Sequence, residues 1–133
     1  MLYHCPVQPW HVAASVDRFG YVNLWENYVG GVLAMTTTHY KFVNGFSNQF
    51  WGWGGEDDDM YNRIVINNLG LARLQGEEFR MMTLGHVRNE TGNEVNLKGT
   101  EMVWSSGNNL QSGLSSLSTC RYRWIQVLVY NLE

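Results

Sequence analysis

The stretch from Trp51 to Asp59, which reads WGWGGEDDD, decides how the rest of this chain is interpreted. It holds two of the six tryptophans, three of the fourteen glycines and four of the twelve acidic residues. Glycine permits positive φ and lets the backbone approach a neighbouring group closely. Tryptophan offers a flat apolar face and one N–H donor. The stretch therefore predicts a loop that changes conformation around a flat, hydroxylated ligand such as a sugar ring.

The four acids from Glu56 to Asp59 support two interpretations. As local structure they form the acidic first turn of a helix that ends near Gly70. Apolar residues continue this pattern at helical spacing through Met60, Tyr61, Ile64 and Val65. A helix cap needs only one acid, however, and four acids with no base among them raise the pKa of at least one carboxyl. The helix and a binding role for its acids are both expected.

The composition predicts one globular domain without a nucleic-acid partner. The 133 residues are 44% hydrophobic and 14% aromatic, which argues against disorder. Only 16% are charged and the net charge is -3, so there is no basic footprint for nucleic acid. No apolar run is long enough to span a membrane, and no signal-like stretch follows Met1. Neutral, hydroxylated ligands fit this balance best.

Short elements are expected along the chain. The Gly30–Gly31 pair indicates either a turn or a close approach of the backbone to another group. Cys5 and Cys120 can pair or stay free, and His4 and His11 are most simply loop or hydrogen-bonding residues. The expected strands are near His11–Val16, at Val32–Met35 (buried), at Leu71–Leu74, at Phe79–Leu84 and within residues 124–131, and a short helix is expected from Thr36 or Thr37 through Val43, closed by Asn44–Gly45.

WGWGGEDDD resembles the signature of the β-1,4-galactosyltransferase family, as do Tyr28–Val32 (YVGGV) and the loop after His86. The resemblance implies an α/β fold, the C-terminal portion of a nucleotide-diphospho-sugar transferase (GT-A-like) domain with a mixed sheet, flanking short helices and long loops. Residues 1–133 are expected to be the C-terminal part of such a catalytic domain. The family's nucleotide-binding half, stem and membrane anchor are expected to lie outside these residues.

The same resemblance assigns roles to individual side chains. Asp57 is the expected general base for the acceptor's 4-hydroxyl. The expected acceptor-binding residues are Trp25, Trp53, Glu56 and Asp58, and the expected donor-binding residues are Tyr28, Gly31 and Trp53. A bulky Tyr28 beside the donor sugar implies galactose rather than N-acetylgalactosamine, because an overpacked site costs roughly 1 to 3 kcal/mol.

A manganese site is also implied, with His86 and a methionine as ligands. The family places a Met and a His three residues apart, whereas Met81 and Met82 lie five and four residues before His86. Residues four apart on a strand share a face, so Met82 is the better companion. The triplet Asp57 to Asp59 is a rival cation site, since hard cations favour clustered carboxylates.

The function implied is an inverting transfer of galactose from UDP-galactose to the 4-hydroxyl of a terminal N-acetylglucosamine in the Golgi lumen, with this chain an incomplete form of the enzyme. A non-catalytic carbohydrate-binding module and an inactive fragment are the alternatives. A third possibility, a structural tryptophan-rich domain, predicts no saccharide binding.

Overall fold

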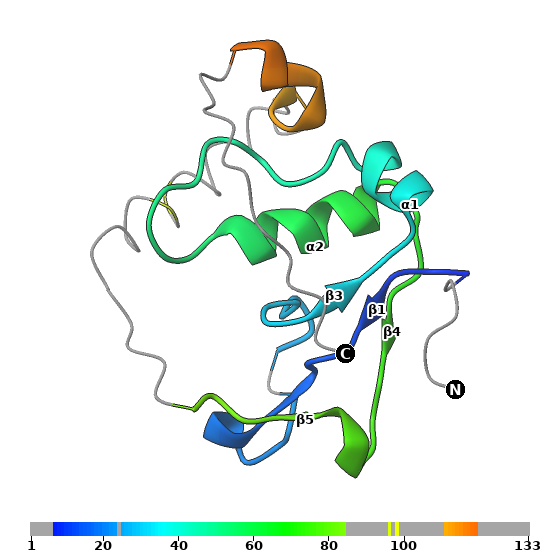
Figure 1. The fold of residues 1–133 in the computed structure, drawn as a ribbon, viewed down its shortest axis with the longest axis vertical. Coiled ribbons are helices and arrows are strands. Elements are labelled where there is room, and N and C mark those ends of the chain that lie inside the picture. The colour runs from blue at the N-terminus through cyan, green and yellow to red at the C-terminus, as the bar shows by residue number, and fades with distance from the viewer. Residues whose placement is uncertain (1–6, 24, 85–95, 97, 99–110, 120–133) are drawn as a thin grey trace, which may run out of the picture.

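The computed structural model describes residues 7–23, 25–84, 96, 98 and 111–119 of the chain. In this part a mixed sheet of short strands lies beside two α-helices, with long loops between them (Figure 1). The predicted α/β class, with a mixed sheet and short helices, is therefore confirmed. The predictions on Cys5, Cys120, His4 and His86 and on a strand within residues 124–131 fall outside the described residues.

The main sheet has three strands in the order β3-β1-β4. Strand β1 (Trp10–His11) pairs antiparallel with β3 (Leu33–Ala34) and parallel with β4 (Ala72–Arg73). In the parallel pair His11 lies opposite Arg73, so the two side chains emerge on the same face of the sheet. The strand predicted within Leu71–Leu74 is this β4.

A second, two-stranded sheet pairs β2 (Ser15–Val16) in parallel with β5 (Arg80–Met81). The 3₁₀ helix η1 (Asp17–Phe19) follows β2 directly. The prediction of one strand near His11–Val16 was wrong in its continuity, because the chain turns after β1 and β2 joins a different sheet.

The strand predicted at Phe79–Leu84 is shorter than expected. The 3₁₀ helix η2 (Glu77–Phe79) occupies its start, and only β5 (Arg80–Met81) is paired. β5 is short because its partner strand β2 has only two residues to pair with it, and the chain continues from β2 directly into η1.

Helix α1 (Thr37–Phe42) matches its prediction closely. The Oγ1 of Thr36 accepts a hydrogen bond from the backbone N–H of His39 at 3.0 Å, which satisfies one of the free donors at the helix start. Asn44 and Gly45 then take φ values of 61° and 64°, the left-handed conformation that ends a helix.

Helix α2 (Glu56–Ile66) carries the four acids in its first turn, as predicted. It ends before the predicted stop at Gly70, because Asn68 already takes a φ of 54°. Asparagine tolerates this left-handed conformation, since its short polar side chain can hydrogen-bond locally. Glycine is thus not needed at this helix end.

The hydrophobic core lies between the two helices and the main sheet, as the position of green α2 beside β3 in Figure 1 shows. Its fully buried members are Val29, Val43, Met60 and Ile64. The strand predicted as buried at Val32–Met35 is only half-buried: Leu33 and Met35 pack against the core, but Val32 is half exposed. Both residues of β3 are therefore half-buried, and the exposed position is Val32, just before the strand.

Candidate functional site

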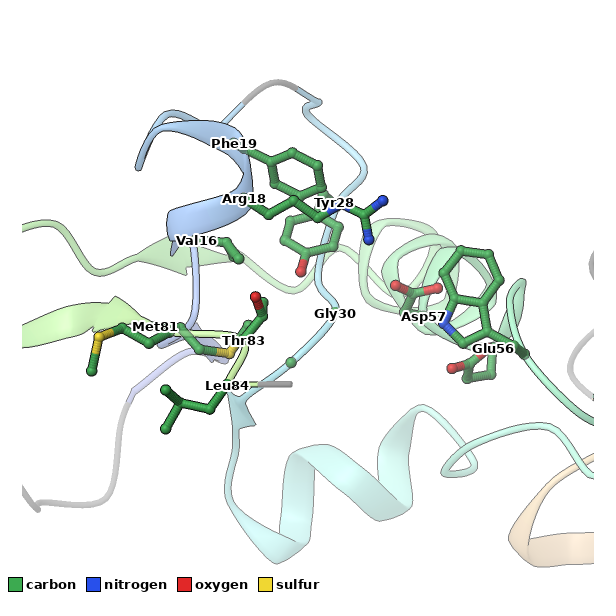
Figure 2. A pocket seen from close by; sticks show the side chains of 13 residues that line it. Val16, Arg18, Phe19, Tyr28, Gly30, Glu56, Asp57, Met81, Thr83 and Leu84 are labelled. Carbon is green, nitrogen blue, oxygen red and sulfur yellow. The ribbon is translucent and has the colours of Figure 1, made fainter. Parts of the chain in front are cut away.

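A pocket of about 610 Å³ opens where four separate segments meet. Figure 2 shows Tyr28 and Phe19 on one side, Asp57 and Glu56 on a second side, and the residues after β5 on a third side. Its lining consists of Val16, Arg18, Phe19, Tyr28, Gly30, Gly31, Trp53, Glu56, Asp57, Met81, Met82, Thr83 and Leu84. The structure therefore brings six of the predicted site residues together: Tyr28, Gly31, Trp53, Glu56, Asp57 and Met82.

The loop before α2 has the positive-φ backbone that its glycines permit. Gly52, Gly54 and Gly55 all have positive φ, at 79°, 98° and 90°. Because side chains with a Cβ rarely adopt these angles, the loop depends on glycine at each of the three positions. This conformation carries half-buried Trp53 into the pocket lining and leaves Trp51 80% exposed.

A buried amide holds this loop from the other side. The Nδ2 of Asn96 donates to the carbonyl oxygens of Trp51 at 2.9 Å and of Trp53 at 3.3 Å. Asn96 is only 6% exposed, so these contacts replace hydration that the amide has lost. The placement of the tryptophan loop is thus tied to a residue more than forty positions away.

The four acids of α2 divide between the pocket, a half-buried edge and the core. Glu56 and Asp57 line the pocket (Figure 2), and Asp58 accepts a hydrogen bond from the Nδ2 of Asn27 at 3.1 Å. Asp59 is fully buried and its Oδ2 lies 2.6 Å from Nε of Arg63. Successive helical residues are rotated by about 100°, so consecutive acids necessarily face different surroundings.

The predicted raised pKa falls on Asp58. Burial raises the pKa of this carboxyl above its ordinary value, and the negative charges of Asp57 and Glu56 raise it further. Repulsion within the acidic run therefore acts in the expected direction on Asp58, second to burial.

The Gly30–Gly31 pair is a close backbone approach, the second of its two predicted interpretations. A Cβ at Gly30 would lie 2.6 Å from Oδ2 of Asp57 and 2.8 Å from a ring carbon of Tyr28. Gly31 has a φ of 83°, and a Cβ there would lie 2.9 Å from the Cβ of Ala13. The missing side chains let the Asp57 carboxylate rest directly against the backbone beside Tyr28.

Two predicted acceptor-binding residues do not line the pocket. Trp25 is half exposed and packs edge-on against Phe19, with ring centroids 5.1 Å apart. Asp58 lies one position beyond the lining acids of α2. Trp25 therefore lies behind Phe19, which itself lines the pocket.

The described residues alone do not form a manganese site. Met82 lines the pocket and is 62% exposed, Met81 packs against Gly31, and His86 lies outside the described residues. Within the described ranges, no group of three or more His, Cys, Asp or Glu side chains is placed to hold a metal ion. Manganese prefers carboxylate, carbonyl and water ligands, so the soft thioether of Met82 does not make a manganese site by itself.

Sequence analysis missed several lining residues. Among the described residues that line the pocket, Arg18 on η1 provides the positive charge. Thr83 joins the lining while its N–H and hydroxyl donate to the carboxylate of Asp17 at 3.1 Å and 3.0 Å. No motif marks either residue; only the packing of η1 beside β5 places them in one pocket.

Carboxylates, aromatic faces and tightly approaching backbone in one pocket are the features of a site for a polyhydroxylated ligand. The protein-family model described as the N-terminal domain of galactosyltransferase matches residues 10–87. This chain belongs to the galactosyltransferase family. No helix in the described ranges has the length and apolar character needed to cross a membrane.

Individual relatives give the extent of the similarity. β-1,4-Galactosyltransferase 1 of Homo sapiens is 32% identical over 130 residues, which cover 98% of this chain and 32% of that protein. β-1,4-Galactosyltransferase 4 of Mus musculus is 35% identical over 132 residues, covering 95% and 36%. The chain thus spans about a third of the length of these relatives.

Among solved structures, the catalytic domain of Drosophila β-1,4-galactosyltransferase 7 in complex with xylobiose is similar to this chain. It has 37% sequence identity and a TM-score of 0.46, over 56% of this chain and 30% of that one. Which part of the longer relatives these residues represent stays a prediction.

Proposed function

We propose that this chain supplies the sugar-binding and proton-accepting part of an inverting enzyme that transfers galactose from UDP-galactose to the 4-hydroxyl of a terminal N-acetylglucosamine. The observation that carries the proposal is the position of Asp57. Its carboxylate lies against Gly30 in the pocket that Tyr28 and Trp53 also line. Family membership over residues 10–87 supports the same reaction class.

Asp57 is proposed as the general base. Transfer with inversion needs one base near the attacking hydroxyl, and a carboxylate contributes about 10² to 10⁴ in rate when it is placed within hydrogen-bond reach. Glu56 is proposed to bind acceptor hydroxyls and Trp53 to offer an aromatic face inside the pocket. Asp58 and Trp25, which do not line the pocket, are proposed to contact the acceptor from outside the lining. Tyr28 and Gly31 are proposed to contact the donor sugar.

The donor diphosphate needs positive charge nearby, and Arg18 is positioned to provide it from the pocket wall. We also propose a manganese cofactor bound with His86 and Met82, and a site of action in the Golgi lumen. Both follow from the family resemblance.

A carbohydrate-binding protein without catalysis is the second candidate function. It is favoured by the lining of the pocket, in which Phe19, Tyr28 and Trp53 provide aromatic rings for a saccharide. The same pocket then binds a saccharide without turnover.

One titration separates the two functions. The purified chain is titrated with N-acetylglucosamine, with and without manganese and UDP-galactose, while tryptophan fluorescence and product formation are followed together. If the wild type binds the saccharide and forms product, the protein is a transferase. If the wild type and the Asp57→Asn variant both bind it and neither forms product, the protein is a binding protein. Absence of any saccharide response contradicts both.

A further inference from the structure

Behind the pocket wall, two side chains bind one short stretch of backbone. Arg73 on β4 donates from Nη1 to the carbonyl oxygen of Tyr28 at 2.9 Å and from Nη2 to that of Glu26. His11 on β1 contacts the carbonyl oxygen of Gly30 through Nε2 at 2.9 Å. Three carbonyls at alternate positions, 26, 28 and 30, are therefore held by side chains.

His11 and Arg73 also contact each other. They are opposite residues in the parallel β1–β4 pair, and Nη1 of Arg73 lies 3.0 Å from Nδ1 of His11. A guanidinium has donors only, so Nδ1 must be the acceptor. The proton of the neutral ring then sits on Nε2, where it is donated to the Gly30 carbonyl. The two contacts define a single neutral tautomer of a fully buried histidine.

The surroundings of His11 favour this neutral form. Burial lowers the pKa of the imidazole, and the positive charge of Arg73 lowers it further, against the opposing effects of the Gly30 carbonyl and the Asp57 carboxylate. These are the charged groups that face the ring from β4 and from α2. The ring of His11 also meets that of Tyr28 edge-on, with centroids 5.2 Å apart.

The donors of Arg73 bind acceptors of the protein. With the Asn23 amide in the orientation that satisfies its neighbours, its oxygen accepts from Nε of Arg73 at 3.2 Å. All three guanidinium nitrogens then have acceptors within the protein. Arg73 is absent from the pocket lining, so its role is exerted through the backbone that it holds.

We propose that His11 and Arg73 are a positioning pair that fixes residues 26–30, and through them the placement of Tyr28 and Asp57 in the pocket. The link is Gly30, whose carbonyl is bound by His11 and whose Cα lies against the Asp57 carboxylate and the Tyr28 ring. The effect on ligand binding rests on the proposed function, whereas the effect on the backbone does not.

The test compares two substitutions of His11 with a control. His11→Gln retains a donor for Gly30 and an acceptor for Arg73, while His11→Phe retains a ring but neither polar atom. His39→Phe on α1, outside the pocket lining, controls for loss of a half-buried histidine. The ¹³C shift of the Gly30 carbonyl, the thermal midpoint and the affinity for N-acetylglucosamine with manganese and UDP-galactose are measured for each.

We expect His11→Phe to shift the Gly30 carbonyl resonance and to weaken saccharide binding about tenfold, the effect of losing about one net hydrogen bond that positions the pocket backbone. His11→Gln and His39→Phe keep both values close to wild type. An unchanged Gly30 resonance in His11→Phe overturns the positioning role, even if saccharide binding by the wild type supports the proposed function.

Two further readouts keep the outcomes separate. If the wild type binds no saccharide, the proposed function fails, and the Gly30 resonance alone decides the positioning role. If His11→Phe does not fold, the ¹⁵N spectrum of the wild-type imidazole decides it. Protonated Nε2 with bare Nδ1, persisting below the usual histidine pKa, supports the pair, and a proton on Nδ1 overturns it.

Discussion

The first turn of α2 contains two regions that are both acidic but lie in different surroundings, one at the pocket and one in the core. The pocket-facing region has Glu56 and Asp57, whose carboxylates line a solvent-accessible space. The core-facing region has Asp59, which pairs with Arg63 at 2.6 Å with both side chains fully buried. Acids two residues apart on a helix point about 200° apart, which separates a site from a core.

The core-facing region is joined to other segments through Arg63. Besides the Asp59 pair, the guanidinium of Arg63 donates to the carbonyls of Val43 at 3.3 Å, Gly45 at 3.2 Å and Ser112 at 2.7 Å. It thereby joins α2 to the end of α1 and to the segment before the 3₁₀ helix η4 (Leu114–Thr119). The comparison teaches that in this acidic run one face carries binding groups and the opposite face stabilises the fold.

The largest expected effect tests the pocket-facing region. Asp57→Asn removes the proposed base and keeps the size of the side chain, so turnover falls by about 10² to 10⁴. It is measured as galactose transfer in a catalytically competent form of the protein, with acceptor binding and thermal midpoint close to wild type. Glu77→Gln, an exposed acid outside this pocket, is the control. Full activity in Asp57→Asn contradicts the assignment.

The next effect tests the core-facing region. Asp59→Asn removes the carboxylate that pairs with the buried Arg63 guanidinium at 2.6 Å, and breaking a buried pair costs about 3 to 5 kcal/mol of unfolding free energy. Urea unfolding measures it. Glu77→Gln is again the matched control, because it breaks the exposed pair with Arg80 and is expected to change stability little. Equal losses in both variants would remove the distinction between the two regions.

The backbone beside Asp57 is tested by two glycines that share positive φ. Gly31 has a φ of 83° with the Ala13 Cβ and Met81 sulfur near its own missing Cβ, whereas Gly20 has a φ of 62° and open space. In both alanine variants the left-handed conformation costs about 1 to 2 kcal/mol of unfolding free energy. Gly31→Ala adds overpacking of about 1 to 3 kcal/mol. Chemical denaturation compares them, and equal stability losses contradict a tight approach at Gly31.

The smallest expected effect concerns pH. A folded-state pKa raised above the unfolded value means that the native state holds its proton longer, so the Asp58 contribution to stability falls as pH rises between those two values. Asp58→Asn is therefore more stable than wild type near neutral pH, and the difference disappears in acid. Urea unfolding from pH 3 to 7 measures it.

The stability contribution of Asp17 changes with pH in the opposite direction to that of Asp58. The hydrogen bond from the backbone N–H of Thr83, aided by the Thr83 hydroxyl, lowers the pKa of Asp17. Its contribution to stability is present above the unfolded pKa and is lost as pH falls through the lower folded value. Asp17→Asn is thus less stable than wild type at neutral pH. Parallel pH profiles for the two variants would contradict these electrostatic environments.

Local signals predicted the elements that depend on local chemistry. The Thr36 cap, the Asn44–Gly45 stop and the acidic start of α2 all appear where expected, because capping and left-handed turns involve residues close in sequence. The strands were less predictable. A two-residue ladder such as β2–β5 is limited by its distant partner, and that partner is not visible in the local pattern.

The candidate site was predicted in part. The WGWGGEDDD stretch, Tyr28 and Gly31 were found because tryptophan, glycine and clustered acids are conspicuous, and five of those residues do line one pocket. Arg18, Thr83, His11 and Arg73 were not assigned to the site, because a lone arginine, threonine or histidine carries no pattern. The roles of the predicted residues, and the metal ligands His86 and Met82, stay predictions.

The sequence by itself determined the family, the helix start at Glu56 and the need for glycine in the loop before it, since these depend on residue types at fixed spacing. Only the tertiary structure decided that Asp57 faces a pocket while Asp59 is buried with Arg63, and that His11 binds Gly30 from behind. The physical reason is that a side chain's surroundings come from segments far away in the chain, whose packing fixes the rotation of α2 and the alignment of β1 with β4.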